Sequence, residues 1–357
     1  MAEHLSYHAQ QDIDNTYRLR ELTADLPPYS KDFFRAIEPR TSARTRIAYA
    51  YDLNIFFEYL HNNNPSLKGK PISEITLQEL EQLTPTDIEE YLDYIKAYSG
   101  EKNFHVNKEQ GIKRKLCSLK SFYRYYYKKQ FIEKNAPSLV DAPKINEKVI
   151  VRLDVDEIAM LLDSVEKGHK LTAHQLKYHE HTKVRDLAIM TLLLGTGLRV
   201  SECVGLDLSD IDFKNGGLKI HRKGGKEVII YFGDEVELAL LDYLEEREMI
   251  IPQTGHENAL FLSMQKKRMS VRSIENMVKK YAQTVTTLKH ITPHKLRSTY
   301  GTQLYQETGD IYLVADVLGH SDVNTTRKHY AAMEDQRRRS ARNAVRLREK
   351  KEDEEDL

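Results

Sequence analysis

The sequence of 357 residues lacks the features of a secreted or membrane-bound protein. Its two cysteines, Cys117 and Cys203, lie far apart and show no metal-ligand spacing, so we expect a reducing compartment and two buried thiols. The N-terminus has neither the basic nor the apolar segment of a signal peptide. The longest apolar run, around residues 187–194, is too short to cross a bilayer. These absences predict a cytoplasmic protein that has no membrane partner.

Net charge is absent as well, because 54 Lys and Arg residues balance 54 Asp and Glu residues. A neutral chain has no overall attraction to nucleic acid, so any basic surface must be local. The length allows two domains, and 40 % hydrophobic and 30 % charged residues are ordinary for a soluble globular protein. Function must therefore be sought in local motifs.

Hydrophobic periodicity predicts a mainly α-helical protein with two domains. Residues 1–40 form a polar N-terminal extension that carries no recognisable motif. Residues 41–134 contain three amphipathic helices, which start near residues 41, 86 and 108. A proline-containing linker, 135–150, separates them from a second domain, 151–336. The end, 337–357, has six arginines between Arg337 and Arg348 and then five acids, so we expect a basic helix and an acidic tail.

Within the second domain the pattern predicts helices near 153–164, 183–194, 236–247 and 270–284. Two short strands, 217–221 and 228–231, flank a basic, glycine-rich hairpin and predict a small antiparallel β-sheet. The insert 167–182 contains four histidines, but none belongs to a defined metal-binding motif. We therefore predict a solvated loop there and no metal site.

The segment 102–152 is strongly basic, with 13 Lys or Arg against 4 Asp or Glu. Its helix, 108–131, has an apolar side and a basic side with interleaved tyrosines. One interpretation is a solvated face with lysine stems lying along apolar surface. The other is a face that binds a polyanion, where each neutralised phosphate releases counterions. The candidate contacts on the basic side are Lys113, Arg114, Lys115, Lys120, Arg124 and Lys128.

Another candidate functional stretch begins at Thr292-Pro293, which has the pattern of a helix N-cap and first helical position. His294 and Arg297 follow, three residues apart near a helix N-terminus that favours anions. The pair suits phosphate, although an exposed helix start with a chance His and Arg is an equal alternative.

Three further residues have a similar ambiguity. Arg199 follows the tight turn Gly195-Thr196-Gly197 and interrupts an apolar neighbourhood, so we expect it to be half-buried with an anionic partner. Glu202, three residues later, is the ordinary candidate for that partner. Lys223 lies in the hairpin, where a lysine is either a solubilising tip residue or a donor that reaches into a groove.

The order of these motifs is more specific than any one of them. Arg199 in Gly-Thr-Gly-Leu-Arg-Val-Ser-Glu, Lys223 in Arg-Lys-Gly-Gly-Lys-Glu, His294-Lys-Leu-Arg297, Leu-Gly-His320 and Tyr330 resemble the tyrosine recombinase (phage integrase) family. Within that family the chain is most similar to the Xer-type recombinases. The resemblance implies a helical core-binding domain at 41–134 and a catalytic domain at 151–336, which together clamp DNA in a C shape.

The resemblance also implies an activity, namely site-specific DNA recombination through a 3′-phosphotyrosyl intermediate and a Holliday junction, without metal, ATP or another cofactor. In the family's roles Tyr330 is the nucleophile, Arg199 and Arg297 bind the scissile phosphate, and Lys223 protonates the leaving oxygen. His294 and His320 assist proton transfer, and Glu202 orients Arg199. The implied partners are double-stranded recombination sites, three further copies of the chain in a tetramer, and an accessory or regulatory protein.

Two positions depart from the family's pattern. Ser298 follows Arg297, where many relatives have His, and Tyr330 comes ten residues after His320, whereas Xer proteins commonly have nine. The spacing of ten is frequent among integrases of mobile elements. Other tyrosines that could compete as nucleophile, at 300, 305 and 312, precede His320 and fit packing positions.

Because the chain is most similar to the Xer-type recombinases, we favour Xer-like chromosome dimer resolution and keep three alternatives. The first is an integrase, excisionase or invertase of a mobile element. The second is a relaxing enzyme similar to type IB topoisomerases. The third is a DNA-binding protein without activity, against which the complete set of catalytic residues argues.

Overall fold

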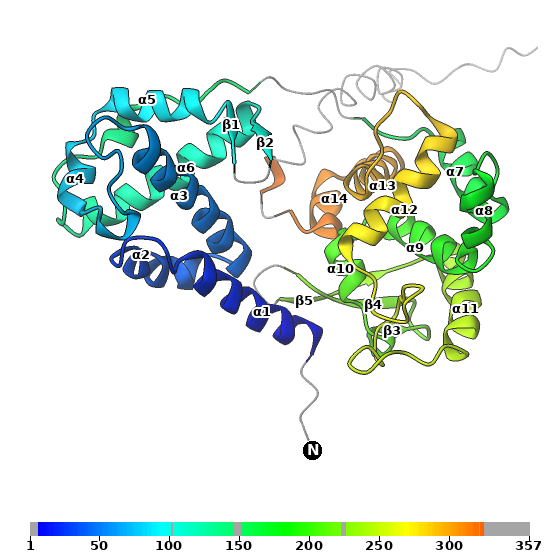
Figure 1. Cartoon of the computed structure of the whole chain (residues 1–357). Helices are drawn as coiled ribbons and strands as arrows, with labels where there is room; N and C mark the ends of the chain where they lie inside the picture. Colours follow the sequence, from blue (N-terminus) through cyan, green and yellow to red (C-terminus); the bar gives the residue numbers. More distant parts are fainter. Residues whose placement is uncertain (1–5, 101–102, 146–150, 223–225, 321, 325–357) are drawn as a thin grey trace, which may run out of the picture. The chain divides into compact units, whose positions relative to one another are not determined.

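The structure is a computed structural model, and it describes residues 6–100, 103–145, 151–222, 226–320 and 322–324. The chain divides into two compact units, Met1–Lys148 and Val149–Leu357 (Figure 1). Helices predominate in both, as predicted, and each unit has one small antiparallel sheet. Among the described residues, no helix is both long and apolar enough to cross a membrane.

The first unit is a helical assembly around an aromatic core. Its elements in order are α1 (Tyr7–Leu22), α2 (Ser30–Ile37), η1 (Glu38–Arg40), α3 (Ala43–Asn63), η2 (Ile72–Glu74), α4 (Leu77–Gln82), α5 (Pro85–Tyr94), β1 (Ala97–Ser99), β2 (Phe104–Val106), α6 (Glu109–Lys128) and η3 (Ala136–Leu139). Phe56, Phe57 and Phe122 are completely buried where α3 and α6 pack together. Phe33, from the predicted N-terminal extension, lies in the same core and packs edge-on against Phe122.

Local signals in the sequence explain where the helices of this unit begin. Ser42 caps α3, close to the predicted start near residue 41, and its side chain accepts a hydrogen bond from the backbone N–H of Thr45. Thr84 and Asp87 form a capping box that starts α5. Sequence reasoning missed the two-stranded sheet of β1 and β2, whose three-residue strands are too short to show a period.

The second unit surrounds one buried helix, α9. The elements are α7 (Val155–Lys167), α8 (Ala173–His179), α9 (Lys183–Thr196), α10 (Val200–Gly205), η4 (Leu208–Asp210), β3 (Ile211–Asp212), β4 (Gly217–His221), β5 (Glu227–Tyr231), α11 (Asp234–Glu248), α12 (Val271–Val285), α13 (Pro293–Thr308) and α14 (Ile311–Leu318). The residues 188–194 of α9 are all buried, and α7, α11 and α13 pack against that helix (Figure 1). A helix that is apolar on all sides must be covered in this way.

The sheet of the second unit has the order β3-β4-β5, with Gly217 opposite Tyr231 and His221 opposite Glu227. This register confirms the predicted hairpin. The predicted solvated loop at 167–182 is wrong, because Thr172 and Gln175 form a capping box that starts α8. His179 at the end of α8 is buried, and one ring nitrogen lies 2.7 Å from the carbonyl oxygen of Val165.

The two thiols differ, although both were expected to be buried. Cys203 is buried, which raises the pKa of its thiol to about 12. Cys117 is exposed, so that half of the expectation is wrong. The general preference of cysteine for cores does not apply at Cys117, because it lies on the solvent side of α6 between positions that face the core.

Candidate active site

Arg199 is held where α9 ends and α10 begins. Gly197 ends α9 in the left-handed conformation, with φ +63°, and a β-carbon there would lie 2.4 Å from the ring of Tyr300. This confirms the tight turn and the close approach predicted for the Gly-Thr-Gly segment. Arg199 then occupies the N-cap position of α10, with 39 % of its side chain exposed.

Glu202 is the partner of Arg199, as the spacing predicted. One carboxylate oxygen accepts a hydrogen bond from Arg199 Nη1 at 2.7 Å, and the other accepts one from the backbone N–H of Arg199 at 2.8 Å. Glu202 is buried, with 6 % exposed. Because the carboxylate holds both the side chain and the backbone, it fixes the direction of the Arg199 guanidinium.

Arg297 is on α13, which begins as predicted with Thr292 at the N-cap and Pro293 at the first helical position. Arg297 is 4 % exposed, so it is not the chance arginine of an exposed helix start that the sequence left as an alternative. Nη1 donates to the carbonyl oxygen of Gly197 at 2.6 Å, and Nη2 donates to that of Leu318. Arg297 therefore links α13 to the ends of α9 and α14. His294, one turn earlier, is exposed.

The third part of the site is the C-terminal end of α14. Gly319 ends this helix with φ +60°, and the backbone N–H of His320 donates to the carbonyl of Ala315 at 2.9 Å. The carbonyl of Gly319 accepts a hydrogen bond from Arg199 Nη2 at 3.1 Å. The fold thus brings Arg199, Glu202 and Arg297 together beside the backbone of Gly319 and His320, although they are up to 121 residues apart in sequence.

Arg222, directly after the β4 strand, is a residue of this neighbourhood that sequence reasoning missed. Its guanidinium donates to the carbonyls of Asp316 and Val317 at 3.2 and 2.6 Å. Burial lowers the pKa of Arg222 below its usual value, and the nearby charge of Glu202 opposes this shift. The basic hairpin was recognised, but only its Lys223 matched the family's pattern.

Two of the predicted catalytic residues, Lys223 and Tyr330, lie outside the described residues. The three competing tyrosines are all described. Tyr305 is buried and Tyr300 is partly buried, as expected for packing positions, and burial raises the pKa of Tyr300. Tyr312 is 71 % exposed, so the prediction that it packs is wrong.

Helix α6 carries the predicted phosphate contacts, and four of the six side chains are exposed. These are Lys113, Arg114, Arg124 and Lys128. Lys120 is partly buried and donates to the carbonyl of Val140 at 2.7 Å. Placing Lys115 on the exposed basic side is wrong, because it is 6 % exposed and donates to Asn107 Oδ1 at 3.0 Å. Burial lowers the pKa of Lys115.

Arg114 is held by an ion pair with a residue of α3. Its Nη1 lies 2.5 Å from a carboxylate oxygen of the buried Asp52, which also accepts a hydrogen bond from Ser118 at 2.7 Å. Burial raises the pKa of Asp52, and the Ser118 hydrogen bond and the Arg114 charge oppose that shift. Despite this contact, 48 % of the Arg114 side chain is exposed to solvent.

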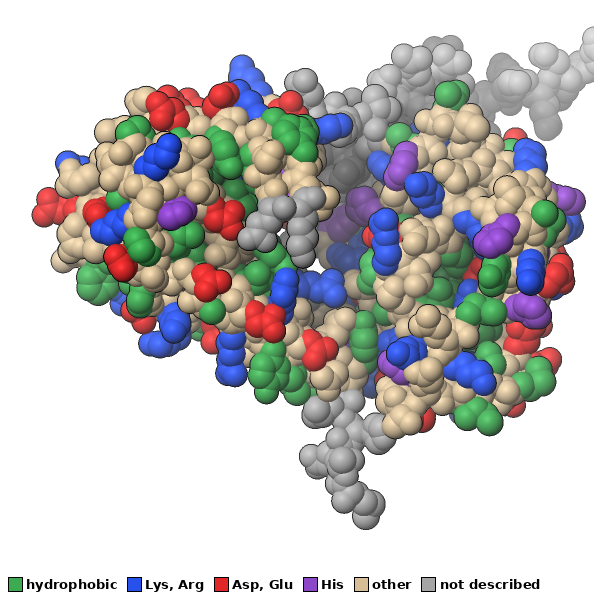
Figure 2. Space-filling view, in the orientation of Figure 1, with side chains coloured by type: hydrophobic (Ala, Val, Ile, Leu, Met, Phe, Trp, Pro, Cys, Tyr) green, Lys and Arg blue, Asp and Glu red, His purple; other side chains and the backbone are tan. Residues whose placement is uncertain are grey.

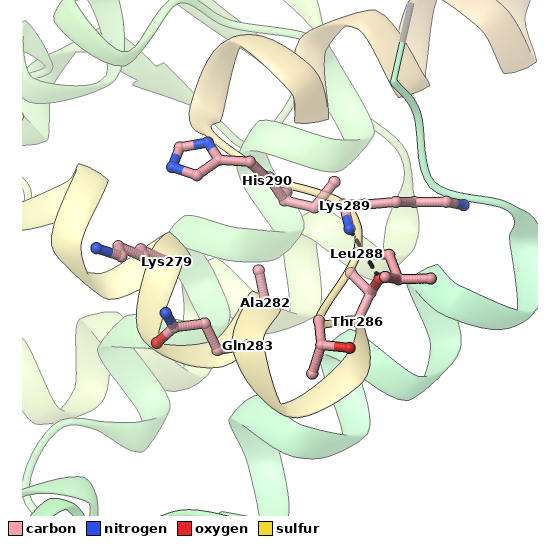
Figure 3. A pocket seen from close by; sticks show the side chains of 9 residues that line it. Lys279, Ala282, Gln283, Thr286, Leu288, Lys289 and His290 are labelled. Atoms are coloured by element: carbon pink, nitrogen blue, oxygen red, sulfur yellow. Dashed lines mark hydrogen bonds between the residues drawn. The ribbon is translucent and has the colours of Figure 1, made fainter.

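The surface in view agrees with the neutral composition. In Figure 2, basic and acidic side chains alternate over each unit, and no patch of one sign covers either. A hollow of about 410 Å³ lies beside the loop before α13. Lys279 and His290, which line it, point to the same side in Figure 3. None of the predicted catalytic residues lines it. No group of three His, Cys, Asp or Glu residues suited to a metal ion occurs in the described parts of the chain.

Known proteins resemble this chain in sequence and in fold. The pattern of the Phage integrase family matches residues 152–337. The chain is 33 % identical over 328 residues to the Tyrosine recombinase XerC of Caldanaerobacter subterraneus subsp. tengcongensis, covering 89 % of this chain and 86 % of that protein.

Two solved structures share the fold. The XerH site-specific recombinase bound to its palindromic difH substrate aligns with a TM-score of 0.62 at 19 % identity, over 93 % of this chain and 95 % of that one. The Tn1549 transposon integrase in complex with circular intermediate DNA aligns with a TM-score of 0.61 at 21 % identity, over 87 % and 98 %.

Proposed function

This chain belongs to the tyrosine recombinase (phage integrase) family, and from that premise we propose that it cuts and rejoins two double-stranded DNA sites through a covalent link to Tyr330. The observation that carries the proposal is the convergence of Arg199 and Arg297 on the end of α14, next to His320. Two forked cations at one point suit the two non-bridging oxygens of a phosphate.

The proposed reaction needs no metal for its charge balance. The hydroxyl oxygen of Tyr330 forms a bond to phosphorus while the bond from phosphorus to the 5′-oxygen breaks. Lys223 gives a proton to the departing 5′-oxygen, and one of the two histidines, His294 or His320, accepts the proton that the Tyr330 hydroxyl loses. Arg199, oriented by Glu202, and Arg297 stabilise the charge of the pentavalent phosphorane. A 5′-hydroxyl from a partner duplex then reverses the step and yields a Holliday junction, without ATP.

A nicked duplex tests this proposal. If the strand beyond the scissile phosphate is short enough to diffuse away, cleavage leaves a covalent protein–DNA adduct that survives a denaturing gel. We expect an adduct with inverted-repeat sites taken from the host genome, and recombinant products from two intact sites. Relaxation of supercoils without strand exchange would favour the topoisomerase-like alternative, and the absence of any adduct would favour a non-catalytic DNA-binding protein.

For the biological role we propose resolution of chromosome dimers, because the relative named above carries an Xer name over most of its length. The alternative is integration, excision or inversion of a mobile element, which the ten-residue spacing between His320 and Tyr330 favours. Deleting the gene distinguishes the two, since dimer resolution requires chromosome multimers to accumulate in the deletion strain.

We propose that the exposed basic side of α6 contacts the DNA backbone as the two units clamp the duplex. Lys113→Ala is expected to weaken duplex binding and to reduce the slope of log affinity against log salt by about one. Lys115→Ala removes the same charge two residues further along α6 but should leave that slope unchanged, because the ammonium is buried against Asn107. Fluorescence anisotropy over a salt series measures both, and equal slopes for the two variants would contradict this orientation of α6.

We also propose that four protomers assemble on two sites, with residues 337–348 of one protomer docking on the second unit of its neighbour. Those residues combine six arginines with an apolar spacing at Ala341, Ala344 and Val345. A hollow of about 360 Å³ on the second unit offers both apolar and acidic side chains to such a segment. Its lining includes Leu162 and Leu304 together with Glu235 and Glu307.

Reversing the charge of this hollow with Glu235→Lys and Glu307→Lys is expected to abolish the tetramer on DNA while a single protomer still binds a half-site within about threefold of wild type. Glu245→Lys with Glu248→Lys makes the same charge change near the other end of α11 and should leave assembly intact. Analytical ultracentrifugation of the DNA complexes measures both. A tetramer that persists after deletion of residues 334–357 would exclude this docking.

A further inference from the structure

Three successive carbonyl groups at the end of α14 each accept a hydrogen bond from a different arginine. Val317 accepts from Arg222, Leu318 from Arg297, and Gly319 from Arg199. The last carbonyls of a helix have no partner within the helix, so they need donors from elsewhere. Two of these donors are the arginines already assigned to the phosphate. The third, Arg222, has no role in the proposed chemistry.

Arg222 is built into the helix end. Its Nη1 and Nη2 atoms donate to two consecutive carbonyls, of Asp316 and Val317. The guanidinium also occupies the space beside Gly319, where a β-carbon would lie 2.4 Å from Nη1 and 2.5 Å from Cζ. Gly319 is therefore needed for its positive φ and for the approach of Arg222.

The positions of the three arginines depend on one another because their acceptors are three consecutive carbonyls. A carbonyl that loses its donor in a partly buried place takes the nearest available N–H, since an unsatisfied acceptor is costly. Without Arg222, the carbonyl of Asp316 would keep the backbone N–H of Gly319 as a donor at 2.8 Å, whereas the carbonyl of Val317 would lose its arginine donor. Arg297 and Arg199 donate to the next two carbonyls, so an N–H of either that moved to Val317 would be lost to the phosphate.

We propose that Arg222 is a positioning residue, which satisfies the carbonyls of Asp316 and Val317 so that Arg199 and Arg297 keep the geometry that binds the scissile phosphate. Arg222 acts through the end of α14 and does not itself touch the DNA. This inference rests on the proposed recombinase chemistry and adds a residue to it.

The first test is the single-turnover rate of adduct formation on the nicked duplex. Arg222→Gln is expected to lower that rate by roughly 10- to 100-fold, because small displacements of catalytic groups have effects of that size. Affinity for the same duplex should stay within about threefold, since no phosphate contact is lost. Arg222→Lys keeps the charge but loses the paired donors, so its rate should fall between those of the wild type and Arg222→Gln.

Arg247→Gln is the matched control. Arg247 is a buried arginine of the same unit that donates to the backbone carbonyls of Glu257 and Ala259. We expect it to lower the melting temperature at least as much as Arg222→Gln while the cleavage rate of the folded protein stays unchanged. If both variants lose rate in proportion to their stability, Arg222 has only a structural role and the proposal fails.

Two further readouts test whether Arg222 acts through the end of α14 and the two phosphate-binding arginines. Gly319→Ala should lower the rate more in the wild type than in Arg222→Gln, because the new methyl group displaces the guanidinium only where it is present. Replacing the scissile phosphate with a neutral methylphosphonate, which depends less on Arg199 and Arg297, should reduce the Arg222→Gln defect. A defect of undiminished size on that substrate would mean that Arg222 does not act through the two phosphate-binding arginines. A wild type that forms no adduct refutes the proposed function, whereas an active wild type and an equally active Arg222→Gln refute this inference alone.

Discussion

The Tyr330→Phe protein is expected to form no covalent adduct with a nicked duplex, although it binds the duplex as tightly as the wild type does. The substitution removes only the hydroxyl oxygen, and a phenyl ring has no atom that can attack phosphorus. Loss of a nucleophile lowers rates by factors of about 10⁴ or more, so the adduct band should disappear in a single-turnover assay. A denaturing gel of the reaction with end-labelled DNA measures the adduct, and a native gel measures binding.

Tyr312→Phe is the control for this prediction, because Tyr312 is the competing tyrosine that the structure exposes most to solvent, at 71 %. It should form the adduct at the wild-type rate. Tryptic digestion of the wild-type adduct should leave the DNA on the peptide that contains Tyr330. An adduct formed by Tyr330→Phe, or a labelled peptide that contains Tyr312, would refute the assignment of the nucleophile.

Local rules explain why much of the site could be predicted. The Thr292-Pro293 start of α13 depends on capping, and the contact between Arg199 and Glu202 depends on a spacing of three residues. Gly197 was recognised because only glycine readily adopts a positive φ beside a close neighbour. Each of these features involves residues that are near one another in the chain. The order of the motifs then identified the family.

Contacts between distant segments could not be predicted in this way. Arg222 is 94 residues from Asp316, and nothing in its own neighbourhood indicates that a helix end will lie against it. The direction of a side chain on a helix posed a second difficulty. Lys115 lies at the border of the apolar side of α6, and it is buried because Asn107 offers a partner. Cys117, on the same helix, is exposed because it points to solvent from between positions that face the core.

The burial of Arg297 shows why a lysine could not replace it, which the sequence alone did not indicate. The guanidinium is held by the carbonyls of Gly197 and Leu318, which come from two different helix ends. Lysine has one ammonium group, which cannot hold both carbonyls and also offer a planar pair of donors to a phosphate. Arg297 is therefore a link in the fold and, in the proposed chemistry, also a phosphate ligand, and an experiment must separate the two roles.

Arg297→Lys is expected to lower the single-turnover cleavage rate by about 10²- to 10³-fold, the range observed when one preorganised donor to a developing charge is removed. If that loss comes from charge on a non-bridging oxygen, a neutral methylphosphonate at the scissile position should make the variant nearly as fast as the wild type on the same substrate. Parallel thermal denaturation measures how much of the loss is due to unfolding.

Arg185→Lys supplies the control for the structural part of the effect. Arg185 is also largely buried in the second unit, and it donates to the carbonyl of Leu262 at 2.8 Å. The variant should be less stable, yet its folded molecules should cleave phosphodiester and methylphosphonate in the wild-type ratio. If Arg297→Lys shows that same ratio, the defect lies in the fold, and Arg297 must be removed from the groups that stabilise the phosphorane.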